Sequence, residues 1–450
     1  MIELTLNEVL EATGGRAFGA FADSPITGVT LDSRKAEKGG LFVAIKGEKA
    51  DGHSFVPMLE GIVSAALVEH PVDCAVAQII VDSTYRAVGD IARLIREKSG
   101  VYVVGVTGSV GKTTAKEMTA AVISRRFCVH KTEKNHNNEL GLPITLFALE
   151  PEHEVAVLEM GISYFGEMSR ISAIARPDLA VFTNIENVHT ENLGDRDGVL
   201  RAKTELVANM RGNTLILNAE DDKLASYKLP NGKKAVYYGF SPACFTYASD
   251  VVYNGMDSAS FTLHMGKDSI NVLLPASGRH HVLDALAAAA AGHEMGLTME
   301  EIRDGLESFK NVGGRMERIP FKGAVIVNDC YNASPASMCA SLDVLARAGG
   351  RKIALLGDML ELGENEAELH RSVGRKAAEV GLYALVAVGQ RAAFIGEGAR
   401  EAGFENVVFS DKDGAAEYLS SILREGDTLL VKASRGMALE DVIANIKDRG

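Results

Sequence analysis

Apolar runs alternate with amphipathic stretches along nearly the whole chain, which is the pattern of strands and helices that follow one another. In the first block, the runs Gly40–Ile45 and Ala75–Val81 predict strands, and Tyr85–Lys98 predicts a helix. The pair Ser99-Gly100 then interrupts the pattern. Residues 1–98 are therefore predicted to form a small α/β domain.

A second block opens on a β-branched apolar run at Val101–Thr107, which is long enough for a strand buried on both faces. A helix is predicted from Lys112 to about Ser124. Further buried strands are predicted at Val155–Leu158, Leu179–Thr183 and Thr214–Leu217. Because strands and helices alternate, we expect a parallel sheet with right-handed crossovers.

The remainder of this block has a different pattern. Tyr237–Leu274 consists of short alternating runs separated by turn residues, which predicts antiparallel strands. Leu283–Ala291 is an alanine-rich helix, and Thr298–Glu301 has the spacing of a capping box that opens another helix. The predicted central domain covers residues 99–312 and includes a small antiparallel part.

The last block, residues 313–450, repeats a strand followed by a helical stretch. Its strands are predicted at Ala324–Val327, Lys352–Leu356, Ala384–Val388, Asn406–Phe409 and Thr428–Lys432. This pattern indicates a Rossmann-like, doubly wound sheet. No G-x-G-x-x-G motif follows the first strand, so the sequence does not favour dinucleotide binding by this domain.

Composition fits several folded domains and excludes some classes of function. Hydrophobic residues make up 46% and charged residues 24% of the 450, enough for large cores. No apolar run approaches the ~20 residues that span a bilayer, and the N-terminus does not resemble a signal peptide, so we expect a cytoplasmic protein. The net charge of −13 argues against nucleic acid as a partner. The five scattered cysteines lack C-x-x-C spacing and are expected to be buried free thiols.

The most specific motif is a glycine-rich loop between the strand Val101–Thr107 and the helix that follows it. It consists of Gly108, Ser109, Val110, Gly111, Lys112, Thr113 and Thr114. Glycines allow backbone N–H groups to turn toward phosphate oxygens, and the helix N-terminus adds its dipole. Lys112 is expected to bridge the β- and γ-phosphates of ATP, and the Thr113 hydroxyl to ligate Mg²⁺. A glycine turn with a simple helix cap is the alternative, and the strand-to-helix context argues against it.

The loop departs from the commonest phosphate-binding form in one position. That form has a glycine five residues before the glycine of the Gly-Lys pair, and Val106 stands there in this chain. The fold class predicted is α/β with three domains, in which a central P-loop-type sheet lies between the N-terminal and the Rossmann-like domains.

The shorter loop Thr-Gly-x-x-Gly-Lys-Thr-Thr resembles that of the Mur ligases and the folylpolyglutamate synthetases. The segments Asn135–Pro143, Leu158–Gly161, Thr183–His189 and Arg201–Glu205 resemble the Mur ligases in particular. Within that family, a further set resembles the member that adds a dipeptide: Lys116–Met118, Tyr331–Pro335 and Leu356–Gly363. The Asp-Asn-Pro-Arg segment of the member that adds the third peptide residue is absent.

The resemblance implies a monomeric, ADP-forming ligase that uses ATP and Mg²⁺. Its substrates would be UDP-N-acetylmuramoyl-tripeptide and D-alanyl-D-alanine, joined through an acyl phosphate in the synthesis of peptidoglycan precursors. Two rival functions remain open at this point. One is a sister ligase that adds a single amino acid, and the other is a P-loop ATPase or motor, although no clear arginine finger or Walker-B acidic pair is visible.

The resemblance also assigns the catalytic residues. It implies that Mg²⁺ is bound by Glu159, His189 and Lys203 in addition to Thr113. Lys203 would be converted by CO₂ into an anionic carbamate, and Lys112 would be catalytic. From the residues alone, Glu159 could equally be a helix cap or a solvent-facing acid. A lone histidine such as His189 is more often structural, and a lysine at the position of Lys203 is usually solvated.

Further contacts to ATP are implied for Asn218 and Asp222 near the adenine, Arg315 at the domain junction, and Asp329 at the ribose. His280 keeps its place in the family segment Gly-Arg-His-Asn-x-x-Asn before the alanine-rich helix. His281 and Asp284 replace both asparagines of that segment. Contacts from these two positions to the nucleotide are therefore in question.

The substrate contacts implied by the resemblance are spread over all three domains. Those in the N-terminal and central domains are Ser33, Arg34, Lys46, Asn137 and Asn138, of which the first three are expected to hold the UDP-sugar. Those in the last domain are Asn332, Asp358, Lys432, Ser434 and Arg435, expected at the dipeptide. The alternative for each of these residues is an ordinary structural role in a turn, a loop or a helix cap.

Overall fold

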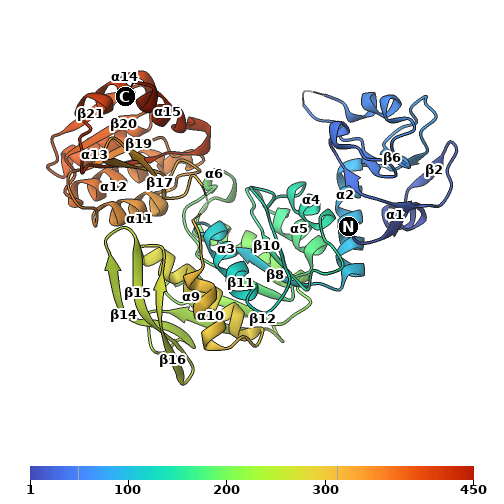
Figure 1. Cartoon of the computed structure of the whole chain (residues 1–450), viewed down its shortest axis with the longest axis horizontal. Coiled ribbons are helices and arrows are strands. Elements are labelled where there is room, and N and C mark those ends of the chain that lie inside the picture. The colour runs from blue at the N-terminus through green and yellow to red at the C-terminus, as the bar shows by residue number, and fades with distance from the viewer. Residues whose placement is uncertain (49, 312, 450) are drawn as a thin grey trace.

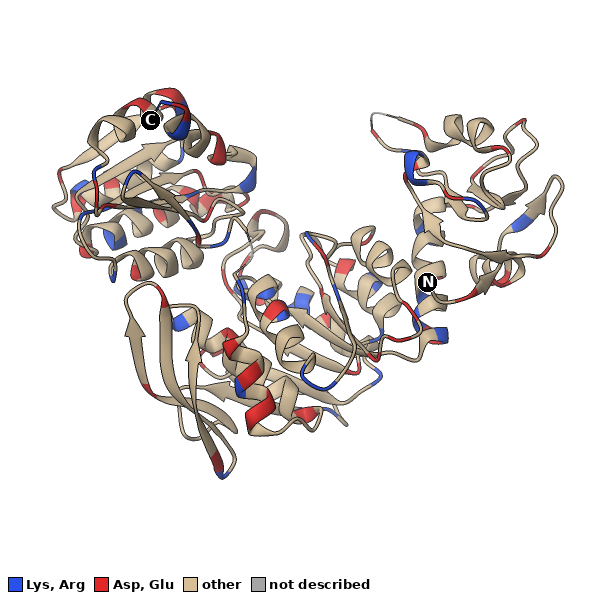
Figure 2. Ribbon diagram, viewed as in Figure 1, with Lys and Arg blue, Asp and Glu red and all other residues tan. Residues whose placement is uncertain are grey.

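The computed structural model describes residues 1–48, 50–311 and 313–449. Figure 1 shows three α/β bodies that follow one another along the chain, with the first and last on opposite sides of the central one. Lys and Arg are interspersed with Asp and Glu in each body (Figure 2). No helix in the described part of the chain is long and apolar enough to cross a membrane.

The N-terminal body contains a five-stranded sheet of order β2-β7-β6-β5-β4 and a two-stranded sheet of β1 and β3. Its elements are β1 Leu4–Thr5, α1 Leu6–Thr13, β2 Arg16–Phe18, β3 Pro25–Ile26, β4 Val29–Thr30, η1 Ser33–Lys35, β5 Leu41–Val43, η2 Gly52–Leu59, β6 Ala65–Val68, β7 Gln78–Ile80 and α2 Thr84–Ser99. Strands β4 to β7 are parallel, and β2 is the antiparallel edge.

Helix α2 joins this body to the next. Its apolar positions, including Val88, Ile91 and Ile95, are fully buried in one core that it shares with the central sheet. Gly100, at φ 66, ends the helix in the left-handed conformation that glycine adopts without strain. The boundary predicted at 98/99 therefore falls in the last turn of a helix that packs against both bodies.

The central body is built on a nine-stranded sheet of order β16-β15-β14-β13-β12-β11-β8-β10-β9. Its elements are β8 Tyr102–Thr107, α3 Lys112–Ile123, β9 Val129–Lys131, α4 Gly141–Phe147, β10 Val155–Glu159, α5 Glu167–Ala175, β11 Leu179–Phe182, α6 Thr190–Leu193, α7 Arg196–Thr204, η3 Glu205–Asn209, β12 Thr214–Asn218, α8 Asp222–Ala225, β13 Lys234–Gly239, β14 Thr246–Asn254, β15 Ser258–Met265, β16 Asp268–Leu274, α9 Arg279–Glu294 and α10 Met299–Glu307. Helices α3, α9 and α10 pack on one face, and α2, α4 and α5 pack on the other.

Two predictions for this body need correction. Only β14, β15 and β16 are antiparallel to one another, whereas β13, which contains the start of the predicted antiparallel stretch, is parallel to both its neighbours. The buried hydroxyl of Tyr238 in β13 donates to the Phe182 carbonyl at 3.0 Å, which ties the strand into the parallel core. Helix α9 begins at Arg279 and not at Leu283, so the residues before the alanine run are already helical.

The C-terminal body has a six-stranded sheet of order β17-β18-β22-β19-β20-β21. Its elements are β17 Glu317–Phe321, β18 Ala324–Asn328, α11 Pro335–Leu345, β19 Lys352–Gly357, η4 Gly363–Asn365, α12 Glu366–Glu379, β20 Ala384–Val388, α13 Ala392–Glu401, β21 Val407–Ser410, α14 Lys412–Ile422, β22 Thr428–Lys432, η5 Arg435–Met437 and α15 Glu440–Arg449. Helices α11 to α13 cover one face, and α14 and α15 cover the other.

Strand β17 was not predicted. It is the antiparallel edge of an otherwise parallel sheet, and it contains Pro320, which cannot donate to a ladder and is tolerated at an edge. The boundary predicted at 312/313 involves Val312, which lies outside the described residues. All five cysteines are free, but Cys128 is exposed, contrary to the expectation that the thiols are buried.

Candidate nucleotide and ligation site

The loop between β8 and α3 depends on its two glycines. Gly108 has φ 148, and a Cβ at this position would overlap the Thr183 hydroxyl at the end of β11. Gly111 has φ 84 and precedes the first turn of α3, which begins without a side-chain cap. The first amides of that helix are therefore left for an anion. Val106 is buried within β8, so the early glycine of longer loops has no counterpart here.

Asn184 fixes the loop from the neighbouring strand end. Its carbonyl accepts from the Ser109 amide, its side-chain oxygen accepts from the Val110 amide, and its amide group donates to the Val110 carbonyl, each at 2.9 Å. Asn184 was not among the predicted site residues. The only signal for it was its position in the segment Thr183–His189, which resembles the Mur ligases.

Lys112 is folded over the loop. Its ammonium donates to the carbonyls of Gly108 and Ser109, both at 3.0 Å. Burial lowers the pKa of Lys112, and the nearby Glu159 carboxylate opposes that change. The lysine is thus a partly desolvated cation at the centre of the loop.

Glu159, at the end of β10, is buried with only 2% of its surface exposed. One carboxylate oxygen accepts from the Thr113 hydroxyl at 2.7 Å, and the other accepts from the Asn137 amide at 2.8 Å. This excludes the alternative of a solvent-facing acid. The structure therefore brings together three predicted residues from three separate segments.

Arg315 reaches the same hydroxyl from the far side of the domain junction. Its guanidinium donates to Thr113 Oγ1 at 2.8 Å and lies 4.0 Å above the ring of Tyr331. The linker that enters the C-terminal body thus supplies a second cation near Lys112, and the charge of Arg315 adds to the lowering of the Lys112 pKa.

Lys203 lies on the buried face of α7 with 1% of its surface exposed. Its usual interpretation as a solvated lysine is therefore wrong. Burial lowers the pKa of Lys203 well below its ordinary value, and the charge of Lys112 lowers it further. Within the described part of the chain, no hydrogen bond or ion pair engages its amine.

His189 precedes α6 and adopts φ 52, which is unusual for a residue other than glycine. Its Nδ1 lies 2.5 Å from the carboxylate of Glu361, which belongs to the C-terminal body. Burial lowers the pKa of His189, Glu361 opposes this, and the charges of Lys112 and Lys203 add to the lowering. No hydrogen bond joins His189 to Glu159, and no cluster of three or more His, Cys, Asp or Glu side chains suited to a metal occurs among the described residues.

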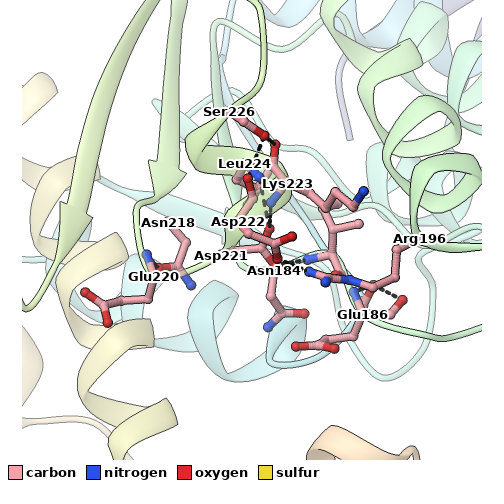
Figure 3. A network of polar contacts seen from close by, with 12 residues as sticks. Asn184, Glu186, Arg196, Asn218, Glu220, Asp221, Asp222, Lys223, Leu224 and Ser226 are labelled. Atoms are coloured by element: carbon pink, nitrogen blue, oxygen red, sulfur yellow. Dashed lines mark hydrogen bonds and ion pairs between the residues drawn. The ribbon is translucent and has the colours of Figure 1, made fainter.

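Asn218 and Asp222, the residues predicted at the adenine, are both shown in the polar network of Figure 3. Asn218 is buried, donates to the Thr183 carbonyl at 2.8 Å and accepts from the Glu220 amide at 2.9 Å. Asp222 is exposed and pairs with Arg196 at 2.5 Å. The buried acid is Asp221 instead, whose carboxylate accepts from the Ile185 amide at 2.7 Å.

The two residues that replace the family asparagines lie on the first turns of α9. His281 Nδ1 lies 2.9 Å from the Ser277 carbonyl, and its ring lies 4.0 Å from that of His280. Asp284 is buried against Gly111, and its Oδ2 has no hydrogen-bond partner in the described part of the protein. Burial raises the pKa of Asp284 well above its usual range, which favours the neutral carboxyl beside the loop, and the charge of Arg315 opposes this change.

Asp329 and Lys432, predicted to bind ribose and dipeptide respectively, form one buried ion pair at 2.7 Å. Asp329 also accepts from Ser341 at 2.6 Å, and Lys432 donates to the Asn332 carbonyl at 3.0 Å. Both side chains are thus engaged within the C-terminal body. The pair connects the end of β18 to the end of β22.

The other predicted dipeptide residues have mixed surroundings. Asp358 is buried and accepts from the Ala392 amide at 2.7 Å, so it caps α13. Ser434 accepts from the Leu360 amide at 2.9 Å and fixes that loop. Arg435 is exposed and pairs with Glu440. The contact of Asp358 is therefore of the kind expected from the alternative interpretation, a structural helix cap.

The predicted UDP-sugar residues lie in the N-terminal body, apart from the loop. Ser33 and Arg34 are on η1, where Arg34 pairs with Asp32 at 2.8 Å and this hydrogen bond lowers the pKa of Asp32 to about 2. The backbone of Lys46 pairs with that of Asp51 in an isolated antiparallel β-bridge. In the central body, the Asn138 side chain accepts from the Gly141 amide at 2.9 Å and caps α4. Among the residues that the structure describes, no hydrogen bond joins these groups to the glycine loop.

These features define a P-loop nucleotide site in a three-domain α/β protein. They are a strand, a glycine loop held by hydrogen bonds, a helix without a side-chain cap, a buried acid and two cations. Comparison with known families agrees with this class. The model of the Mur ligase middle domain matches residues 106–292, that of the Mur ligase glutamate ligase domain matches 314–435, and that of the Mur ligase family catalytic domain matches 25–94.

The chain is also similar to named proteins over its whole length. It is 35% identical to UDP-N-acetylmuramoyl-tripeptide--D-alanyl-D-alanine ligase of Escherichia coli, covering 100% of both chains, and 36% identical to the Bacillus subtilis protein of that name, covering 99% of both. A crystal structure of MurF from Acinetobacter baumannii superposes with a TM-score of 0.91 at 32% identity, covering 99% of both chains. A MurF ligase from Thermotoga maritima, in complex with ADP, superposes with a TM-score of 0.84 at 29% identity, covering 93% of this chain and 97% of that one. The chain belongs to the Mur ligase family.

Proposed function

We propose that this protein joins D-alanyl-D-alanine to UDP-N-acetylmuramoyl-tripeptide and converts ATP to ADP and phosphate. The observation that carries the proposal is the convergence of Lys112, Arg315 and the Thr113–Glu159 pair on one P-loop. The full-length similarity to ligases of that name in two bacteria supports the choice of substrates. The ADP complex of a similar MurF ligase supports the nucleotide.

The reaction needs cations and fixed donors and no protein nucleophile. The tripeptide carboxylate attacks the γ-phosphorus of ATP, the bond to the bridging oxygen breaks, and ADP leaves with that electron pair. The amine of the dipeptide then attacks the acyl carbon, loses a proton and expels phosphate. Because carboxylate and triphosphate repel each other, Lys112, Arg315 and the amides of α3 lower the barrier by neutralising charge that is already in place.

The residues present fit a Mg²⁺ ion. Thr113 Oγ1 and Glu159 Oε2 lie 2.7 Å apart and provide a hydroxyl and a carboxylate, oxygen donors of the kind that suit this ion. Thr113 and Glu159 would hold the ion, which would supply positive charge beside the phosphates of ATP. Lys203 suits the carbamylation known in the family, because its amine is buried, unpaired in the described part of the chain, and held toward the neutral form.

We further propose that residues 1–98 bind the UDP-sugar, that 99–312 bind ATP and that 313–450 bind the dipeptide, in the cytoplasm. Ser33 and Arg34 on η1 provide a hydroxyl and a guanidinium, which suit a diphosphate. Asn332 and Ser434 lie in the segments that follow the carboxyl ends of β18 and β22, the edge at which open α/β sheets bind ligands.

Phosphate release tests the proposal. We expect release to require both D-alanyl-D-alanine and the UDP-tripeptide, supplied with either lysine or diaminopimelate at the third position. Lys112→Ala should abolish it, whereas Lys234→Ala, an exposed lysine on β13, should not. Hydrolysis that ignores both substrates would identify a P-loop ATPase, and acceptance of a single amino acid would identify a sister ligase.

A further inference from the structure

Two loops from different bodies meet at helix α6, which extends toward the C-terminal body in Figure 1. His189 Nδ1 lies 2.5 Å from Glu361 Oε2, and the Thr190 hydroxyl donates to the Leu362 carbonyl at 2.9 Å. A Cβ added at Gly363 would lie 3.5 Å from the backbone nitrogen of Glu191, so the two segments approach each other closely here. The contact is therefore a small, specific interface made beside a residue of the nucleotide site.

Both partners in the closest contact have strained backbones. His189 has φ 52 and Glu361 has φ 64, and neither is glycine. Left-handed conformations are strained for residues that have a Cβ. Strain of this kind persists where the surroundings impose it, and it gathers at functional positions. Its occurrence on both sides of one hydrogen bond indicates that the geometry of this bond matters.

The Glu361 side of the contact is held by its own domain. The Leu360 amide donates to Ser434 Oγ at 2.9 Å, and the Met359 amide donates to His370 Nε2 at 3.0 Å. Ser434 follows β22, and His370 is buried in α12. The carboxylate is thus placed by the C-terminal sheet, and it moves with that body.

A carboxylate can only accept a hydrogen bond, so the proton of this bond belongs to Nδ1 of His189. In the neutral ring, the lone pair is then on Nε2. Metal-binding histidines commonly donate their other N–H to a carboxylate, which fixes both tautomer and ring orientation. His189 has such a partner, and it comes from a different domain.

We infer that Glu361 is a positioning residue that fixes the Nδ1–H tautomer of His189 across the domain interface, so that Nε2 is presented to the divalent cation bound with the nucleotide. The role of His189 at the cation is the one implied by the resemblance to the Mur ligases and rests on the proposed function, whereas the tautomer rests on the contact with Glu361. It follows that the cation site is complete only while the C-terminal body is docked. The domain proposed to deliver the dipeptide thereby controls the metal chemistry at the P-loop.

The tautomer can be observed directly in the full-length protein. In ¹⁵N-histidine-labelled protein at about pH 8, above the ordinary histidine pKa of about 6.5, two-bond ¹⁵N–¹H spectra distinguish Nδ1–H from Nε2–H rings. The His189 signal is assigned among the 11 histidines by its loss in His189→Gln. We expect Nδ1–H in the wild type and a shift toward Nε2–H in Glu361→Ala.

Two control variants separate positioning from simple docking. Glu364→Ala removes the same charge from an exposed neighbour on η4, and Thr190→Val removes the other polar contact of the interface. Neither should change the tautomer. An unchanged His189 tautomer in Glu361→Ala, or an equal change in Thr190→Val, overturns the inference.

Cation affinity provides the second measurement. Mn²⁺ binding, followed by electron paramagnetic resonance with a non-hydrolysable ATP analogue present, should weaken about tenfold or more in Glu361→Ala. It should be unchanged in Glu364→Ala. Equal or tighter Mn²⁺ binding in Glu361→Ala contradicts the inference. Failure of the proposed function would be seen separately, as phosphate release by the wild type that ignores both substrates, and it leaves the tautomer result intact.

Discussion

Carbamylation of Lys203 is the prediction on which the chemistry of the site depends most directly. Carbon dioxide reacts with a neutral amine and not with an ammonium. An exposed lysine with a pKa of about 10.4 is neutral in only ~0.1% of molecules at about pH 7.4, and each unit by which the pKa falls raises that share nearly tenfold. Burial of Lys203 at 1% exposure, next to Lys112, lowers its pKa well below the ordinary value. The fold therefore prepares this amine for the reaction.

Two substitutions at this position separate charge from volume. Lys203→Ala and Lys203→Met both remove the carbamate, and we expect activity to fall about 10²–10³-fold, or about 3–4 kcal/mol, as when one preorganised electrostatic group is removed. Lys203→Ala leaves a cavity next to the site, which formate or another short carboxylate can enter. The methionine side chain fills that volume, so formate should restore part of the activity of Lys203→Ala and none of that of Lys203→Met.

The assay is substrate-dependent phosphate release, in buffer depleted of CO₂ and in buffer with bicarbonate. A carbamate carbon signal after incubation with ¹³C-bicarbonate should be present in the wild type and absent in both variants. Full activity of Lys203→Met, or equal rescue of the two variants by formate, would refute the reasoning. Insensitivity of the wild type to CO₂, together with the absence of a carbamate signal, would refute it as well.

Three further changes test the geometry around the loop. Gly111→Ala places a Cβ 2.8 Å from Asp284 Oδ1 in a residue with φ 84, and ATP binding measured by calorimetry should weaken at least tenfold. The control Gly403→Ala has a similar φ of 89 with no atom within 4 Å of the new Cβ, so it should show only the effect of backbone strain. Asp284→Asn removes a carboxyl whose pKa is raised by folding. Because the folded state then binds a proton more readily than the unfolded state, this carboxyl lowers the free energy of unfolding increasingly as the pH rises above about 3.9, the pKa of an aspartate in the unfolded chain. This variant should therefore be more stable at neutral pH, with a thermal midpoint that varies less with pH. Arg315→Ala removes the bond to Thr113 and should raise the KM for ATP about tenfold, with Arg400→Ala as an unaffected control.

The elements that matter most for the site were predictable because they are local. The strand Tyr102–Thr107 and the helix from Lys112 follow from an apolar run, a glycine pair and a lysine at fixed spacing. The capping box at Thr298 was predicted for the same reason, since all of its partners lie within three residues. Strand β17 was missed, because an edge strand that contains Pro320 has no apolar run of its own.

The choice between neighbouring acids required the tertiary structure. Asp222 was predicted at the adenine; in the structure it is exposed and pairs with Arg196, and its neighbour Asp221 is buried. Two adjacent aspartates are equivalent in a sequence pattern. Asp221 is the buried one because it is the N-cap of α8, where its carboxylate accepts from the Lys223 and Leu224 amides as well as from the Ile185 amide.

The sequence by itself determined the three α/β units, the phosphate loop and the family, because these depend on local periodicity and on short motifs. Only the tertiary structure decided that Lys203 is buried beside Lys112, that Glu159 and Thr113 are in contact, and that Glu361 meets His189. Charges on distant segments change each other's pKa and orientation only when folding brings them within a few ångströms in a region from which water is excluded. That proximity, together with desolvation, is what turns scattered polar residues into a catalytic site.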